Sequence, residues 1–171
     1  MLVRDAPELE VFMLRRNLNS DFVGGAYVFP GGGVDEADRD TDLERWCDGR
    51  SDSDASKRLG LDRGGLAFWV AAIRECFEEA GVLLARHRAG GEVVDFTESE
   101  MGRRFGAHRK AVDASELRMA DLARSEDLVL ATTWPLAVHF APETRLAVAW
   151  HGSDLTRPAL IEGRAAVAGR A

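Results

Sequence analysis

Three glutamates, Glu75, Glu78 and Glu79, lie close together in the sequence and follow Arg74. Residues three and four positions apart are neighbours on a helix, so a helix here places the three carboxylates on one face. Such crowding is unfavourable in water, whereas a hard divalent cation such as Mg²⁺ takes oxygen ligands and reverses the repulsion. Arg74 can hold one carboxylate by a charge-assisted hydrogen bond. These residues predict cation binding, and the alternative is an ordinary solvated helix face.

A glycine-rich bend, Phe29-Pro30-Gly31-Gly32-Gly33-Val34-Asp35, precedes the glutamates in the chain. It follows a short apolar run, and the backbone of a glycine turn can approach a phosphate or a metal closely because no side chain intervenes. A glutamate-rich face alone is usually solvated, so this bend is the context that favours a cation site. We expect the bend and the glutamates to be adjacent in space.

A helix must carry the glutamates, and its apolar pattern predicts where it runs. Apolar residues at spacings of three and four mark one stripe that begins at Leu66, and the helix is expected to stop at Gly81. The stripe consists of Leu66, Val70, Ile73, Phe77 and Ala80. Arg74 and the glutamates fall on the opposite side.

Other segments are expected to form short strands, turns and one more helix. The apolar runs at 11–14 and 27–29 have strand length and composition, and residues 17–26 have loop chemistry. Between 35 and 65 the chain is rich in Asp, Arg, Ser and Gly, which predicts a charged and partly helical insertion. Further strands are expected at 82–85, 92–96, 128–133 and 146–150, and a helix from Ser115 as its cap to Arg124.

Composition limits the classes of protein to consider. The 171 residues suit one domain, and 46% apolar residues are enough for a hydrophobic core. A net charge of −7 argues against binding nucleic acid through bulk charge. Cys47 and Cys76 are too few for a disulfide framework or a four-cysteine zinc site. No apolar run has the length of a membrane span or a signal peptide, so the expected location is the cytoplasm.

The segment 74–82 resembles the second half of the signature box of the Nudix hydrolases, which reads Arg-Glu-apolar-x-Glu-Glu-x-Gly-apolar. Every specified position matches, with Cys76 in the first apolar position. In the first half of the box Gly32 takes the glycine position and Asp38 stands at the glutamate position. The box arginine would then fall at position 46, which is Trp46, and it appears at position 74, so 28 residues interrupt the box.

Because its box is interrupted at this place, the chain resembles the coenzyme A diphosphatase branch of the family and its bacterial relatives. Arg16, Gly25 and the Phe-Pro-Gly-Gly run at 29–32 fit the spacing of a segment that such proteins carry upstream. Asn17 and Asp21 replace a serine and a second arginine of that segment. The change at Asp21 removes a basic group suited to an anionic nucleotide, so ADP-ribose and NADH stand as alternative substrates.

The resemblance implies a Nudix-type α/β/α sandwich with a mixed sheet, as one domain over residues 1–171. The charged insertion lies at about 39–65 inside the box, and residues 144–171 form an unassigned C-terminal segment to which the resemblance does not extend. The domain is expected to be incomplete at both termini, which favours association into a homodimer. The implied activity is metal-dependent hydrolysis of a nucleoside diphosphate linked to another moiety, with coenzyme A or an acyl-CoA as leading substrate.

The resemblance also implies the roles of individual residues. Mg²⁺ or Mn²⁺ would be bound by Glu78 and Glu79, with the carbonyl of Gly32 as a further ligand. Glu75 would be another ligand or would help to orient the attacking water. The expected catalytic residues are Arg74, Glu75 and Glu78. The expected substrate contacts are Arg16, Gly31 and Gly32.

Two further interpretations remain open from the sequence. Arg103, Arg104, Arg109 and Lys110 form a local basic cluster, for which we favour a solvated loop over contacts with nucleotide phosphates. A rival from a different class of function is a non-catalytic Nudix remnant that binds a nucleotide or a partner protein. The expected partner is otherwise a small-molecule nucleotide, with no nucleic acid and no membrane.

Overall fold

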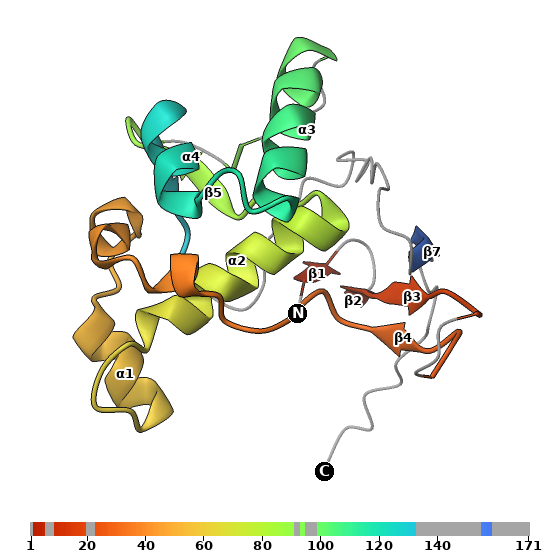
Figure 1. Ribbon diagram of the computed structural model, residues 1–171, viewed down its shortest axis with the longest axis horizontal. Helices are drawn as coiled ribbons and strands as arrows, with labels where there is room; N and C mark the ends of the chain where they lie inside the picture. The colour runs from red at the N-terminus through yellow and green to blue at the C-terminus, as the bar shows by residue number, and fades with distance from the viewer. Residues whose placement is uncertain are drawn as a thin grey trace. The chain divides into compact units, whose positions relative to one another are not determined.

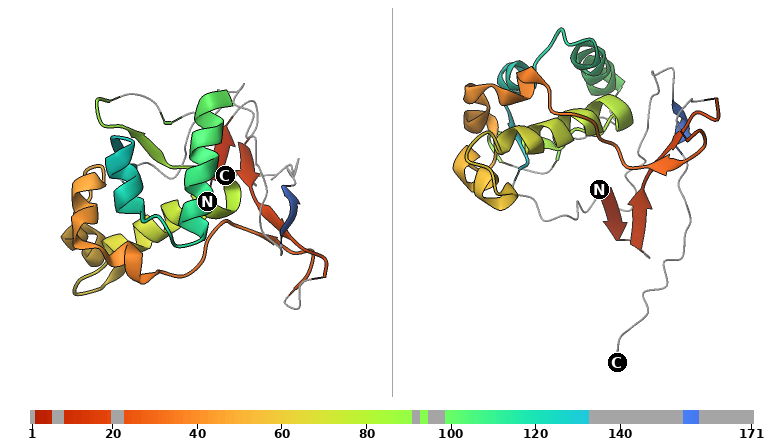
Figure 2. Two further views of the ribbon diagram at one scale, coloured as in Figure 1. Left: turned by 45° about the horizontal axis from the view of Figure 1, so that its top comes forward. Right: turned by 60° about the horizontal axis from the view of Figure 1, so that its bottom comes forward.

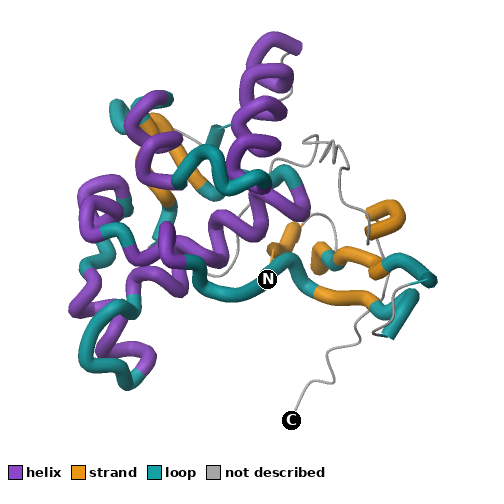
Figure 3. The backbone as a smooth tube through the Cα atoms, in the orientation of Figure 1, coloured by secondary structure: helices purple, strands orange, loops and turns teal. Residues whose placement is uncertain are grey.

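The structure is a computed structural model that describes residues 2–5, 9–19, 23–90, 93–94, 99–132 and 155–158. The chain divides into two compact units. The strand unit comprises Met1–Phe29, Trp134–Leu146 and Trp150–Ala171, and the helical unit comprises Pro30–Thr133 and Ala147–Ala149. Figure 1 labels the elements, and Figure 3 distinguishes helices from strands.

The described part of the strand unit contains five short strands. β1 (Leu2–Asp5) pairs antiparallel with β2 (Leu9–Phe12). β3 (Leu14–Arg16) lies between β4 (Tyr27–Val28) and β7 (Leu155–Pro158). Both strands expected at 11–14 and 27–29 are therefore confirmed, although the first is divided between β2 and β3 at Met13. The predicted loop between them contains a turn in which the Gly25 N–H donates to the carbonyl of Arg16 (3.3 Å).

The helix predicted from the apolar stripe is α2 (Leu66–Ala80), and its stripe is buried as expected. It ends at Gly81, whose φ of 67° is a left-handed conformation that glycine adopts without a steric penalty. The Gly81 N–H donates to the carbonyl of Phe77 (3.0 Å) and the Val82 N–H to that of Cys76 (3.1 Å). These bonds satisfy two of the last carbonyls of the helix, and together with the left-handed glycine they end α2 at this point.

The charged insertion forms helical structure, as predicted, and part of it positions α2. Its elements are η1 (Glu36–Arg39), η2 (Thr41–Trp46) and α1 (Asp52–Leu59). The Asp52 side chain accepts the backbone N–H groups of Gly64 and Leu66, each at 2.9 Å, and so caps the start of α2. A Cβ at Gly65 would lie 2.2 Å from the Ser56 backbone nitrogen, so only glycine permits this approach of α1 to α2.

The second half of the helical unit contains two helices and an antiparallel pair of strands. They are β5 (Ala85–His87), α3 (Ser99–Asp113), α4 (Met119–Ser125) and β6 (Leu128–Leu130). The strand expected at 82–85 begins only at Ala85, and the strand expected at 128–133 is confirmed over β6. Val93 forms a bridge with Arg86, whereas the rest of the strand expected at 92–96 lies mainly outside the described residues, as does all of 146–150.

The prediction of a helix from Ser115 to Arg124 is wrong at its start. Ser115 lies in a turn with a φ of 58°, and α4 begins four residues later, with Arg118 at the N-cap position. The turn ends α3, because the Ser115 N–H donates to the carbonyl of Val112 (2.8 Å). α3 itself was not predicted, and it shows that the basic cluster around Arg109 lies on a helix and not on a loop.

α2 runs through the core of the helical unit. It contacts η1, α1 and α3 (Figure 2). Phe77 of α2 packs in one apolar cluster with Leu43 of η2, Phe105 of α3 and Leu122 of α4. The bulk of this cluster anchors α2 and leaves the helix side that faces the glycine bend available for polar residues.

The mixture of helices and strands confirms the α/β class. Among the described residues the strands form three small sheets, with orders β1-β2, β4-β3-β7 and β5-β6. All their pairings are antiparallel, and the isolated bridge between Cys47 and Leu130 is parallel. No helix in the described residues has both the length and the apolar character needed to cross a bilayer.

Candidate functional site

Arg74 lies at the centre of the candidate site and is buried, with 7% of its surface exposed. Its Nη2 donates to the carbonyl of Gly33 (2.8 Å), and its Nε donates to Asp38 Oδ1 (3.1 Å). The sequence placed Arg74 on the polar side of α2, and it is buried because the glycine bend and η1 cover that side. The arginine therefore links three parts of the helical unit that are distant in sequence.

Asp38 is the main partner of Arg74. It is 2% exposed, and its Oδ2 lies 3.0 Å from Arg74 Nη2. The same oxygen accepts the backbone N–H of Asp35 (2.9 Å), which closes a capping box at the start of η1. Asp38 stands at the glutamate position of the interrupted box, so the pattern located this residue, although its contact with Arg74 had not been predicted.

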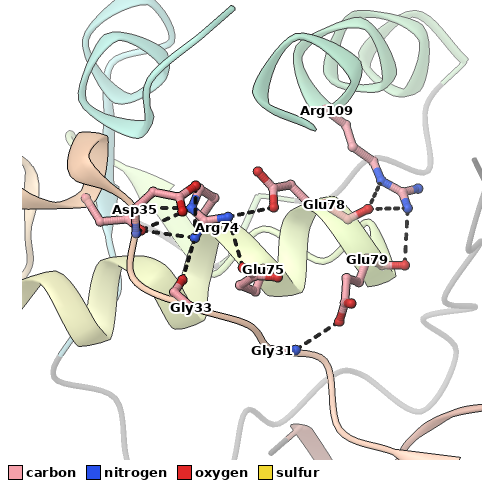
Figure 4. Close-up of polar contacts among 9 residues, drawn as sticks. Gly31, Gly33, Asp35, Arg74, Glu75, Glu78, Glu79 and Arg109 are labelled. Atoms are coloured by element: carbon pink, nitrogen blue, oxygen red, sulfur yellow. Dashed lines mark hydrogen bonds and ion pairs between the residues drawn. The ribbon is translucent and has the colours of Figure 1, made fainter. Parts of the chain in front are cut away.

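Two of the three glutamates share one nitrogen of Arg74. Arg74 Nη1 donates to Glu78 Oε2 at 2.8 Å and lies 3.0 Å from Glu75 Oε1 (Figure 4). The side chains of both glutamates are 13% exposed. The predicted contact of Arg74 with a carboxylate one turn along the helix is thus present. Because one cation holds two carboxylates, their mutual repulsion is reduced without a metal.

The glycine bend lies against these carboxylates, as expected from the sequence. The Gly31 N–H donates to Glu79 Oε2 (2.9 Å). At Gly32 a Cβ would lie 2.4 Å from Glu75 Oε1, so the carboxylate occupies the space that any side chain would need. The bend therefore meets α2 through two glutamates, and a side chain at position 32 would force the Glu75 carboxylate to move.

Burial raises the pKa of Glu78 from its ordinary value of 4.5 to about 7. The charge of Arg74 opposes this increase, while the charges of Glu75 and Asp113 add to it. Burial lowers the pKa of Arg74, but the hydrogen bond and charge of Asp38 outweigh this effect and raise it overall, so Arg74 stays a cation. In the metal-free protein Glu78 can therefore hold or release a proton near neutral pH.

Arg109 reaches the site from α3. Its Nε donates to the backbone carbonyl of Glu78 (2.8 Å), and its Nη2 donates to the carbonyls of Glu78 (2.5 Å) and Glu79 (3.2 Å). Figure 4 shows this side chain directed at the end of α2. No sequence pattern distinguishes Arg109 from the other residues of the basic cluster, since the contact depends on how α3 packs against α2.

The donor set suits a hard divalent cation, although the side chains are not arranged around one. Carboxylate oxygens are the ligands that Mg²⁺ and Mn²⁺ prefer. A cation among three partly buried carboxylates would reduce the repulsion between their charges. In the described part of the chain, however, no three acidic, histidine or cysteine side chains are grouped closely enough to hold a metal. Glu75 and Glu78 are held by Arg74, and Glu79 by Gly31.

The remaining predicted substrate residue, Arg16, lies in β3 of the strand unit. Its backbone N–H donates to the carbonyl of Ala26 (2.9 Å), which closes the turn between β3 and β4. Asp21, which replaces the second basic residue of the upstream segment, lies outside the described residues. Gly31, Gly32 and the three glutamates, in contrast, are brought together within the helical unit.

Comparison of the sequence with known proteins finds acyl-coenzyme A diphosphatases. The chain is 35% identical over 97 residues to that of Xenopus laevis, a match that covers 45% of this chain and 26% of the relative. It is 33% identical over 109 residues to that of Homo sapiens, covering 48% of this chain and 28% of the relative. The matches thus span about a quarter of the length of these curated relatives. No family profile matches the chain.

Comparison of the structure finds a Nudix hydrolase from Alicyclobacillus acidocaldarius. The TM-score is 0.61, and the match covers 92% of this chain and 73% of that protein. The sequences are 19% identical, so this likeness establishes the fold and nothing finer. It confirms the fold class that the interrupted box implied.

Proposed function

We propose that the protein is a Nudix-type diphosphatase. The proposal is supported by the Nudix-type fold of the chain and by its resemblance to the acyl-coenzyme A diphosphatase branch of that superfamily. Its reaction would be metal-dependent hydrolysis of a nucleoside diphosphate linked to another moiety. The oxygen of water adds to one phosphorus of the diphosphate, and the bridging P–O bond breaks with its electron pair on the leaving phosphate. The proton of the attacking water passes to a base that the chain or the solvent supplies.

One observation carries this proposal: carboxylates of α2 meet the glycine bend within a few ångströms. Glu79 accepts the N–H of Gly31 (2.9 Å), and Glu75 fills the space beside the Gly32 Cα. The bend and the helix are separated by the whole charged insertion in sequence. The glutamates of an ordinary surface helix stay in water, because burying a carboxylate costs free energy. Burial of these glutamates against a distant bend therefore distinguishes α2 from such a helix.

The residues of the site have distinct proposed roles. Glu78 and Glu79 would hold Mg²⁺ or Mn²⁺, with Glu75 and the Gly32 carbonyl as further ligands. When bound there, the cation would supply positive charge for the phosphate oxygens and would lower the pKa of a bound water. Arg74 positions Glu75 and Glu78 through its Nη1, which leaves their remaining oxygens for other contacts. Glu75 also orients the attacking water, and Gly31 and Gly32 offer backbone groups to the substrate.

Coenzyme A or an acyl-CoA is the substrate we propose within this reaction class. The products would be 3′,5′-ADP and the corresponding phosphopantetheine compound. The support comes from the names of the sequence relatives and from the upstream Arg16, Gly25 and Phe-Pro-Gly-Gly spacing. Asp21 stands where a basic residue would favour an anionic nucleotide, which weakens the assignment of coenzyme A. ADP-ribose and NADH are the alternative substrates to be measured.

A second candidate function is a non-catalytic remnant that binds a nucleotide or a partner protein. It is favoured by the arrangement of the carboxylates, which in the described residues bind Arg74 and Gly31 and do not form a cluster of three around one position. A catalytic protein would have to exchange some of these contacts for a cation. Metal binding therefore distinguishes the two candidates.

The deciding experiment is a substrate panel. The protein is incubated with Mg²⁺ or Mn²⁺ and coenzyme A, an acyl-CoA, ADP-ribose, NADH or nucleoside triphosphates, and the products are separated by chromatography. Fast turnover of coenzyme A or its acyl derivative supports the leading proposal, and a preference for ADP-ribose or NADH replaces it with the alternative substrate. A folded protein that binds nucleotide without turnover in either metal identifies a remnant.

A further inference from the structure

The geometry points to Arg109 of α3 as a positioning residue that fixes the backbone of Glu78 and Glu79 and thereby directs their side chains. This inference rests on the proposed function, because it assigns a role to Arg109 at that same site. Arg109 donates hydrogen bonds to the backbone carbonyls of both glutamates. It would therefore act through the helix end and is not proposed as a catalytic residue.

The end of α2 needs a cation from elsewhere. The last carbonyls of a helix have no partner within the helix, and the macrodipole places partial negative charge there. Within Leu66–Ala80, all of which the structure describes, the last turn carries no basic residue and instead carries Glu78 and Glu79. Two negatively charged glutamates at a helix C-terminus are unfavourable because the helix dipole is negative there. Arg109 supplies a positive charge and donates three hydrogen bonds to the carbonyls of this end.

Gly81 leaves room for the guanidinium of Arg109. A Cβ at Gly81 would lie 3.2 Å from Arg109 Nη1, which is a tight contact. The same glycine has the left-handed φ of 67° that terminates α2. One residue therefore ends the helix and leaves the space in which Arg109 reaches the carbonyls just before it.

The consequence for the site is that two neighbouring glutamates point in different directions. The Glu78 carboxylate contacts Arg74, whereas the Glu79 carboxylate contacts the N–H of Gly31. Figure 4 shows the two side chains diverging from the last turn of α2, with Arg109 on their carbonyls. That divergence depends on a fixed backbone, since a frayed last turn would let both side chains rotate freely in solvent.

The test compares Arg109→Met, which removes charge and donors, with Arg109→Lys, which keeps the charge but loses the guanidinium fork. Arg58→Met, at an exposed arginine of α1, is the matched control. Three quantities are measured: amide hydrogen exchange of Gly81 and Val82 in metal-free protein, the dissociation constant of Mn²⁺ from its electron paramagnetic resonance signal, and kcat and KM with the best substrate.

For Arg109→Met we expect exchange at Gly81 and Val82 to accelerate about tenfold, and the Mn²⁺ dissociation constant to rise about tenfold, with kcat lowered and KM little changed. Arg109→Lys should be intermediate, and it carries the test if Arg109→Met does not fold. Unchanged Mn²⁺ affinity in a folded Arg109 variant overturns the inference, even where exchange is faster, because Arg109 is then structural only. A wild-type protein that neither binds Mn²⁺ nor hydrolyses the panel refutes the proposed function instead. In that case accelerated exchange in Arg109→Met shows that Arg109 stabilises the helix end without positioning a metal site, and unchanged exchange removes that stabilising role as well.

Discussion

Arg74 and Asp38 form a buried ion pair, with Nη2 3.0 Å from Oδ2, although 36 positions separate them in the chain. The pair spans the charged insertion, which lies between its two members. Through it η1 and α2 share one charge-neutralising contact, and the glycine bend that leads into η1 is drawn against the glutamates. Asp38 is therefore a structural anchor of the site although it contacts no proposed ligand position.

Asp38→Asn should destabilise the fold strongly. The substitution leaves the buried guanidinium of Arg74 without its main anion, and breaking a buried pair costs about 3 kcal/mol or more. Urea unfolding of metal-free protein at neutral pH measures the loss. Asp42→Asn is the control, because that side chain is 51% exposed and its ion pairs with Arg45 and Arg124, each at 3.8 Å, are worth about 0.5 kcal/mol apiece. Equal effects of the two substitutions would contradict the anchoring role of Asp38.

Asp52 should make stability fall at acid pH. The hydrogen bonds from the backbone N–H of Leu66 and then of Gly64 hold the pKa of Asp52 below its ordinary value of 3.8. Because the folded state prefers the carboxylate, this contribution is complete above pH 3.8 and is lost as the pH falls through the lower folded-state pKa. Asp52→Ala should lower the free energy of unfolding by about 1 kcal/mol at pH 7.

The pH series supplies the check on Asp52. The difference between wild type and Asp52→Ala, measured by urea unfolding, should shrink steadily below about pH 4 as the wild-type carboxyl is protonated. Asp62→Ala, at an exposed position in the same connection between α1 and α2, should show no such trend. A difference that stays constant from pH 7 to pH 3 would mean that the charge of Asp52 is not what caps α2.

The sequence was sufficient for the elements whose pattern is local. The apolar stripe of α2 and its glycine stop predicted Leu66–Ala80 closely, because periodic burial and a left-handed cap are both encoded within the helix. The adjacency of the bend and the glutamates could also be predicted, because the backbone of a glycine turn can closely approach a metal or phosphate that the glutamates would bind. These features follow from residue type and spacing alone.

The parts that the sequence did not predict depend on packing between distant elements. α3 has a sparse apolar stripe, with Phe105 and Val112 buried and Gly102 and Gly106 within it, so its pattern is weak without the core it packs against. Serine is a residue type that often caps a helix, but Ser115 lies in the turn that follows α3. The burial of Arg74 and the contact of Arg109 with two carbonyls arise only when η1 and α3 close over α2.

Gly32→Ala should impair activity more than stability. The added methyl would lie 2.4 Å from Glu75 Oε1, so either the carboxylate or the bend must move. We expect kcat for the best substrate of the panel to fall by at least tenfold, while the free energy of unfolding changes by about 1 kcal/mol or less, because the flexible glutamate can rotate away. Gly33→Ala is the matched control, since a Cβ there meets nothing within 4 Å. If both variants keep full activity, the close approach of Gly32 to Glu75 has no role in the reaction.

Glu78→Gln should separate function from stability at the same residue. Glutamine keeps the shape of the side chain and can still accept from Arg74 Nη1, but it removes a charge that burial disfavours strongly enough to raise the pKa of Glu78 to about 7. In metal-free protein at pH 8 the variant should therefore be as stable as wild type or more stable, because the desolvation cost of the carboxylate is gone. Turnover of the best substrate should fall by about a hundredfold or more, since an amide is a poor ligand for Mg²⁺ or Mn²⁺.

Thermal unfolding in the presence of a chelator and initial rates in Mg²⁺ measure these two effects of Glu78→Gln on one preparation. Full activity in Glu78→Gln would remove this residue from the proposed metal site, and a large loss of stability would show that its charge supports the fold through Arg74.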